Sequence, residues 1–139
     1  VRRRKSTCGE ASKMIVVPIL AIASTIAVVW SAYKYQPAYV ALIDALPPQF
    51  QDGLNSKFAF PEYVLRSTTP LPTQADYVES LVGFCCAALG IALLCFLYEN
   101  QVVGAIVFVM FIAFSFLTIR SWKVYRANCS RQPFQDGAQ

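Results

Sequence analysis

Three uncharged apolar stretches, each long enough to cross a lipid bilayer, constrain this chain most strongly. They cover Met14–Tyr33, Ser80–Tyr98 and Val102–Ile119, and none contains Asp, Glu, Lys or Arg. A bilayer core of about 30 Å needs about 20 helical residues to cross it. The sequence therefore predicts an all-α integral membrane protein with three transmembrane helices.

The connection between the second and third stretches consists only of Glu99-Asn100-Gln101. Three polar residues are enough to reverse a chain between antiparallel helices. One helix running through all of 80–119 would be about 60 Å long, which is too long for a single bilayer. We therefore expect a single span over 14–33, followed by a tight helical hairpin whose spans cover 80–98 and 102–119.

The polar segments differ in charge. Residues 1–13 carry five basic side chains against Glu10, and residues 120–139 carry four against Asp136, whereas the loop over 34–79 has a net charge of −2. We expect a basic N-terminal tail, an acidic and proline-rich extramembrane loop, and a basic C-terminal tail. Basic ends on such a chain favour lipid headgroups over nucleic acid, because no nucleic-acid-binding fold could form here.

The loop divides into two predicted parts. Pro37–Leu46 has apolar residues at helical spacing and stops at Pro47-Pro48, which predicts a short helix lying on the membrane face. After Gly53, aromatic residues alternate with prolines, which predicts an extended strap that is stable mainly against another protein. Asp76 and Glu79 are expected at the N-terminus of the second span's helix, where the helix dipole favours negative charge.

Aromatic and basic side chains flank the spans in a pattern that predicts interfacial anchoring. Under the three-span arrangement, six aromatic residues fall at one membrane face and Tyr98 marks the other. Three basic residues follow the third span at helical spacing and are expected to contact lipid headgroups. The predicted lipid and interface anchors are Trp30, Tyr33, Tyr35, Tyr77, Trp122, Tyr125, Arg120, Lys123 and Arg126.

Small residues recur on one side of the first and second spans. Such stripes let helix backbones approach closely in a membrane. The predicted helix-packing residues are Ala23, Ala27 and Ser31 in the first span, and Gly83, Ala87 and Gly90 in the second.

Few residues of this chain predict chemistry. There is no His, and three of the five cysteines lie in the second span, where thiols usually act as small apolar groups, so we expect no metal centre and no enzymatic activity. Glu99, Asn100 and Gln101 could offer oxygen ligands to a chlorophyll magnesium, although a solvated turn is the simpler interpretation. We expect no intrinsic cofactor, with lipid, chlorophyll or carotenoid as candidates at subunit interfaces. Asn128-Cys129-Ser130 matches the glycosylation acceptor pattern.

The orientation rests on the compact basic cluster between Arg2 and Lys13, which favours an N-terminus in cytosol, stroma or matrix. The acidic loop would then face a lumen or an intermembrane space. The chain begins with Val1, and Arg2-Arg3-Arg4-Lys5 would suit the region after an organellar targeting peptide, as well as the flank of a first span. An organellar membrane is expected, with the thylakoid slightly favoured over the mitochondrial inner membrane.

These features together favour a non-catalytic accessory subunit of a large energy-converting membrane complex, either a photosystem or a respiratory complex. Its spans would pack on other membrane subunits and on lipid, and its loop and tails would tie neighbouring subunits together. A small channel or transporter subunit is the alternative from another class. It is disfavoured because Ser24, Thr25, Ser31, Ser115 and Thr118 are too few and too scattered to line a water path.

The layout also resembles a three-span accessory subunit of the oligosaccharyltransferase complex. The likeness consists of a single span, a loop of about 40 residues with Pro47-Pro48, the stretch Gln74-Ala75-Asp76-Tyr77-Val78-Glu79-Ser80-Leu81, and a tight hairpin. The connection between spans two and three is shorter here, and the N-terminal flank differs. This resemblance implies an assembly or recruitment role in the endoplasmic reticulum membrane.

Overall fold

The computed structural model describes residues 7–51 and 53–131, and these residues are all-helical, with no strand. The predicted tails lie outside the described residues over 1–6 and 132–139, as does Asp52 of the acidic loop. Within the described residues, four α-helices and one short 3-10 helix follow one another. They are α1 (Thr7–Ile43), η1 (Pro48–Phe50), α2 (Gly53–Val64), α3 (Leu71–Leu97) and α4 (Gln101–Arg131).

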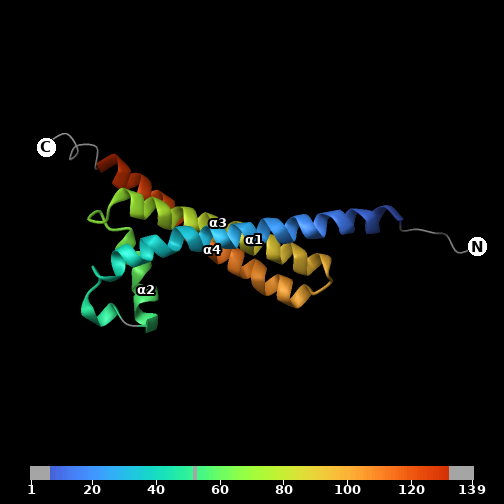
Figure 1. Cartoon of the computed structure of the whole chain (residues 1–139), viewed down its shortest axis with the longest axis horizontal. Helices are drawn as coiled ribbons and strands as arrows, with labels where there is room; N and C mark the ends of the chain where they lie inside the picture. Colours follow the sequence, from blue (N-terminus) through green and yellow to red (C-terminus); the bar gives the residue numbers. More distant parts are fainter. Residues whose placement is uncertain (1–6, 52, 132–139) are drawn as a thin grey trace, which may run out of the picture.

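The long helices α1, α3 and α4 form one row in which α3 lies between the other two, and they overlap near their middle in the view of Figure 1. Helix α3 packs along both of its neighbours, whereas α1 and α4 do not approach each other. Each of the three is long and apolar enough to cross a membrane. The expected hairpin is present, because α3 and α4 are separate antiparallel helices joined by a short turn.

The central position of α3 determines how much of each helix is buried. In the most apolar window of α3, 39% of the residues are buried, compared with 11% in α1 and 6% in α4. The outer helices therefore present most of their large apolar side chains to the surroundings, as expected of helices in contact with lipid or with another protein.

A compact head forms at one end of the row, where the end of α1, the start of α3 and the end of α4 meet η1 and α2 (Figure 1). Phe60 of α2 is fully buried at its centre. Its ring makes edge contacts with Tyr35, Tyr39 and Tyr77, at centroid distances of 5.2, 5.4 and 5.4 Å. Such contacts add to the area that an aromatic ring buries. The main hydrophobic cluster thus lies in the head and not between the long helices.

Three expectations about the loop are wrong. The short separate helix over Pro37–Leu46 does not form, because α1 continues through Pro37 to Ile43. The extended strap is instead mostly the helix α2, which contains Pro61 and is held by the burial of Phe60. Asp76 and Glu79 do not cap a helix start, because α3 begins at Leu71, after Pro70, and has no acidic residue in its first turn.

Candidate functional site

An ion cluster joins α1 to α3 beside the head. The Lys34 ammonium donates to Asp76 Oδ1 and Glu79 Oε2, both at 2.9 Å. The two carboxylates lie three residues apart and so share one face of α3. Lys34 also lies 5.4 Å from the ring centroid of Trp30, one helical turn earlier in α1. With one positive and two negative groups, the cluster carries a net charge of about −1 at neutral pH.

The cluster lies one bilayer thickness away from the other end of the row. At the opposite end, Lys13 of α1 and Tyr98 of the hairpin turn line one shallow pocket. Lys13 and Lys34 are 21 residues apart in α1, which is about 30 Å of helix. This distance matches the hydrocarbon core of a bilayer. The two charged levels are therefore spaced as the two interfaces of a membrane would require.

The predicted anchors do not all reach the surface. Trp30, Tyr33 and Trp122 are exposed, and so are the basic residues Arg120, Lys123 and Arg126. Tyr77 is buried, with its hydroxyl hydrogen-bonded to Ser121, so it stabilises the head and cannot contact headgroups. Tyr35 is half-buried against Phe60, and Tyr125 is half-buried and hydrogen-bonded to Cys129.

A groove of about 480 Å³ runs between α1 and α4 over one face of α3. The α3 residues along it lead from Glu79 at the head end through Val82 and Gly83 to Cys86. Trp30 contributes to the α1 wall and Trp122 to the α4 wall. Glu79 is the only charged side chain that lines it. The groove therefore combines an apolar channel with one acidic, aromatic end.

Five of the six predicted packing residues lie where α1 and α3 are in contact or close to it. A Cβ on Gly83 would overlap Ser31 Oγ and lie 3.2 Å from the backbone oxygen of Ala27. A Cβ on Gly90 would overlap the hydroxyl of Ser24. Ala87 is buried between these glycines. The sixth residue, Ala23, is exposed, and Ser24 takes its place in the contact.

The residues predicted as pigment ligands build the hairpin turn. Glu99 has φ +61°, and the amides of Glu99 and Asn100 donate to the carbonyls of Phe96 and Cys95. This pattern is a Schellman motif, in which the left-handed position usually holds Gly. Asn100 Oδ1 accepts from the Val103 amide, as an N-cap of α4 does, and Gln101 is the first residue of α4. Their role toward a pigment stays a prediction.

Two buried amides link the head to α4. Gln74 Nε2 donates to the carbonyls of Arg66 and Thr69, at 3.1 and 2.7 Å. Asn128 Nδ2 donates to Gln74 Oε1 at 2.9 Å and to the carbonyl of Leu65 at 3.0 Å. Asn128 therefore has a buried structural role, and the folded chain does not offer its amide for glycosylation.

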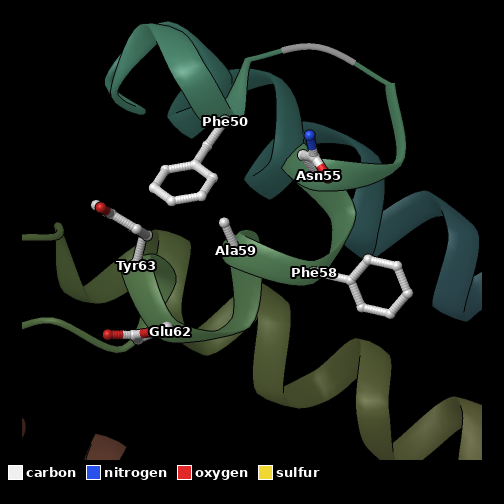
Figure 2. A pocket seen from close by; sticks show the side chains of 6 residues that line it. All are labelled: Phe50, Asn55, Phe58, Ala59, Glu62 and Tyr63. Carbon is white, nitrogen blue, oxygen red and sulfur yellow. The ribbon is translucent and has the colours of Figure 1, made fainter.

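A second hollow, of about 390 Å³, lies on the outer side of α2 (Figure 2). Phe50, Ala59 and Tyr63 face one another there, whereas Phe58 points away from them. The Arg66 guanidinium covers the Tyr63 ring at 3.8 Å from its centroid and lies 3.7 Å from Glu62. This surface combines aromatic rings with the Glu62–Arg66 ion pair, and Glu62 is the one acidic side chain that lines the hollow.

The Ser and Thr side chains of the three predicted spans are bonded within the chain, and Ser80 donates to the carbonyl of Tyr77. The hydroxyls of Ser24, Thr25, Ser31 and Thr118 each donate to a carbonyl four residues earlier. Ser115 Oγ and Thr118 Oγ1 lie 3.9 and 3.3 Å from the Cys85 sulfur. Among the described residues, no group of three or more Cys, Asp or Glu side chains could hold a metal ion.

Comparison of the chain with protein-family models, with curated proteins and with solved structures found no match. The oligosaccharyltransferase resemblance therefore gains no support from these comparisons. Sequence reasoning missed the Lys34 cluster and the Gln74–Asn128 link, because each joins residues more than 40 positions apart. A lone Lys at the end of an apolar stretch and acidic residues at the start of another were the only available signals.

Proposed function

We propose that this chain is a membrane-embedded, non-catalytic accessory subunit of a larger complex. The observation that carries the proposal is that the six Ser and Thr hydroxyls of the three predicted spans are all bonded within the chain, five of them to the backbone of their own helix. A hydroxyl used in this way has given its only proton to another group of the chain, and six such groups spread over three helices are too few to line a water path or to hold a permeating ion. The spans therefore give little support to a channel or transporter role, and we propose the structural role instead.

The shape of the row also favours a subunit that contacts neighbours. A row with α3 in the middle encloses no space, and α4 leaves most of its apolar side chains uncovered by the chain itself. Helix α1 extends past the hairpin turn with no other segment of the described chain beside it (Figure 1). A helix end that packs against no other segment has only marginal stability in water. A neighbouring subunit would stabilise it.

The setting that we propose is an energy-converting organelle, with a thylakoid photosystem favoured over a mitochondrial inner-membrane complex. This step rests on an analogy between this chain and the small multi-span subunits that are numerous in such complexes. The acidic loop and the basic N-terminal cluster suit a chain whose head faces the lumen. The endoplasmic reticulum remains the alternative that the layout resemblance implies.

Native gel electrophoresis of mildly solubilised membranes tests this proposal. The band that contains the chain should be large, and mass spectrometry should identify core membrane subunits in it. An absorption spectrum of the same band distinguishes a pigment-bearing complex from a respiratory or a colourless one. A small band that contains only this chain would contradict the accessory role.

A further inference from the structure

The groove between α1 and α4 is suited to an amphiphile, because its two ends differ in character. At the head end, Glu79 lies between the walls that carry Trp30 and Trp122. From there the α3 face leads through Val82 to Cys86, seven residues or about 10 Å further along the helix. A ligand that fills the groove must therefore have a polar group at one end and an apolar body at the other.

The charge at the head end selects a cation. Glu79 and Asp76 share a single ammonium, that of Lys34, and among the described residues neither carboxylate has another basic partner within ion-pair distance. The side chain of Glu79 is 51% exposed, so one side of it remains free to meet a ligand. One unit of negative charge is thus left beside the groove.

The two tryptophans favour the same kind of group. The face of an indole ring attracts a cation, and aromatic rings around a carboxylate are a common arrangement for binding quaternary ammonium groups. The Lys34 ammonium, which its ion pairs with Asp76 and Glu79 hold in place, lies 5.4 Å from the centroid of the Trp30 ring, so a cation beside Glu79 is also close to this indole. Trp122 is about half exposed and makes no described contact with a cation.

We propose that this groove, which we call the Trp groove, binds a phospholipid with a quaternary ammonium headgroup. The trimethylammonium group lies by Glu79 and the two tryptophans, and an acyl chain follows the α3 face toward Cys86. The site rests on the proposed membrane insertion but not on membership of any complex. Lys123, which is exposed directly after Trp122, could favour an anionic headgroup instead, and the experiment separates these two cases.

The intrinsic tryptophan fluorescence of the chain reports on this groove without a label, because the chain has two tryptophans, Trp30 and Trp122, and both line the groove. The purified full chain is reconstituted in bilayers of equal parts phosphatidylcholine and phosphatidylglycerol. Bromine, which quenches tryptophan, is placed near the glycerol end of the acyl chains of one lipid or of the other. The composition stays the same, so a difference in quenching measures which lipid occupies the groove.

We expect brominated phosphatidylcholine to quench more strongly, corresponding to an enrichment of about three- to tenfold beside the tryptophans. Glu79→Gln should abolish the difference. Glu62→Gln, which removes an exposed carboxylate on α2 away from the groove, should preserve it. Cys86→Phe, at an exposed position on the groove floor, should weaken quenching by either lipid.

Three results would overturn the proposal while leaving membrane insertion intact. These are equal quenching by the two lipids, stronger quenching by brominated phosphatidylglycerol, and an unchanged preference in Glu79→Gln. An absence of quenching by either lipid would contradict membrane insertion itself and, with it, the lipid site. Far-ultraviolet circular dichroism of each variant verifies that the helices are retained.

Discussion

The close approach of α1 and α3 at Gly90 allows a quantitative test by substitution. A Cβ at this position would overlap Ser24 Oγ and lie 3.3 Å from Ser24 Cβ. The hydroxyl could turn away only by giving up its 2.7 Å bond to the carbonyl of Leu20. Overpacking of this kind costs about 1–3 kcal/mol, and the better helix propensity of Ala recovers up to about 1 kcal/mol. We expect Gly90→Ala to lower the free energy of unfolding by about 1–2 kcal/mol.

A second substitution isolates the cause. Ser24→Ala removes the overlapping atom and leaves contacts to Gly90 that can relax by a few tenths of an ångström. Alone it should cost about 0.5 kcal/mol, since it removes only an intrahelical hydroxyl bond. The double variant should be about as stable as Ser24→Ala, which gives a coupling energy of about 1–2 kcal/mol.

The equivalent pair at Gly83 should respond differently. A Cβ on Gly83 meets the backbone oxygen of Ala27 at 3.2 Å as well as the side chain of Ser31. A backbone oxygen in a helix cannot turn aside, so Ser31→Ala should rescue Gly83→Ala only in part. Unfolding by dodecyl sulfate in mixed micelles, followed by tryptophan fluorescence, measures all of these variants. Two results would refute the packing argument. In the first, Gly90→Ala is as stable as the wild type. In the second, Gly90→Ala lowers the free energy of unfolding by the same amount in the Ser24→Ala background as in the wild type.

Three further substitutions test the head and the turn by the same unfolding measurement. Phe60→Ala should cost about 3–5 kcal/mol because it empties the centre of the head, whereas Phe58→Ala, at a side chain that is 81% exposed, should change stability by less than about 0.5 kcal/mol. Glu99→Gly should stabilise the hairpin by about 1 kcal/mol, since Gly adopts the left-handed conformation without strain, and a loss of stability would contradict the Schellman assignment. Gln74→Leu should cost about 2–4 kcal/mol because it leaves buried partners without hydrogen bonds, and a neutral result would show that the amide link to Asn128 contributes little.

The sequence was sufficient to predict the long helices and the hairpin, because both depend on local properties. Absence of charge over 18 to 20 residues and a three-residue polar turn can be recognised without knowledge of the tertiary structure. Helix α2 was missed for the opposite reason. Pro61 and the alternating aromatic residues resembled an extended strap, whereas the burial of Phe60 against three distant tyrosines overrides this local signal.

The register of the α1 stripe shows a similar limit. Small residues at every fourth position predicted a contact stripe of Ala23, Ala27 and Ser31. In the structure the contact with α3 uses Ser24, Ala27 and Ser31, which are spaced by three and four residues. A helix has 3.6 residues per turn, so either spacing describes a possible face, and only the position of α3 decides between them. The Trp groove could not be predicted, because its walls come from three helices that are far apart in the sequence.

The central claim, that the uncovered outer helix α4 contacts a neighbouring subunit, can be tested directly by photocrosslinking in native membranes. A photoreactive phenylalanine analogue at Phe116, whose side chain is 68% exposed on α4, should form an adduct with one defined membrane protein. The same analogue at Phe60, buried in the head, should react only within the chain. Adducts with lipid alone at Phe116, in membranes where the chain is abundant, would contradict the accessory-subunit account.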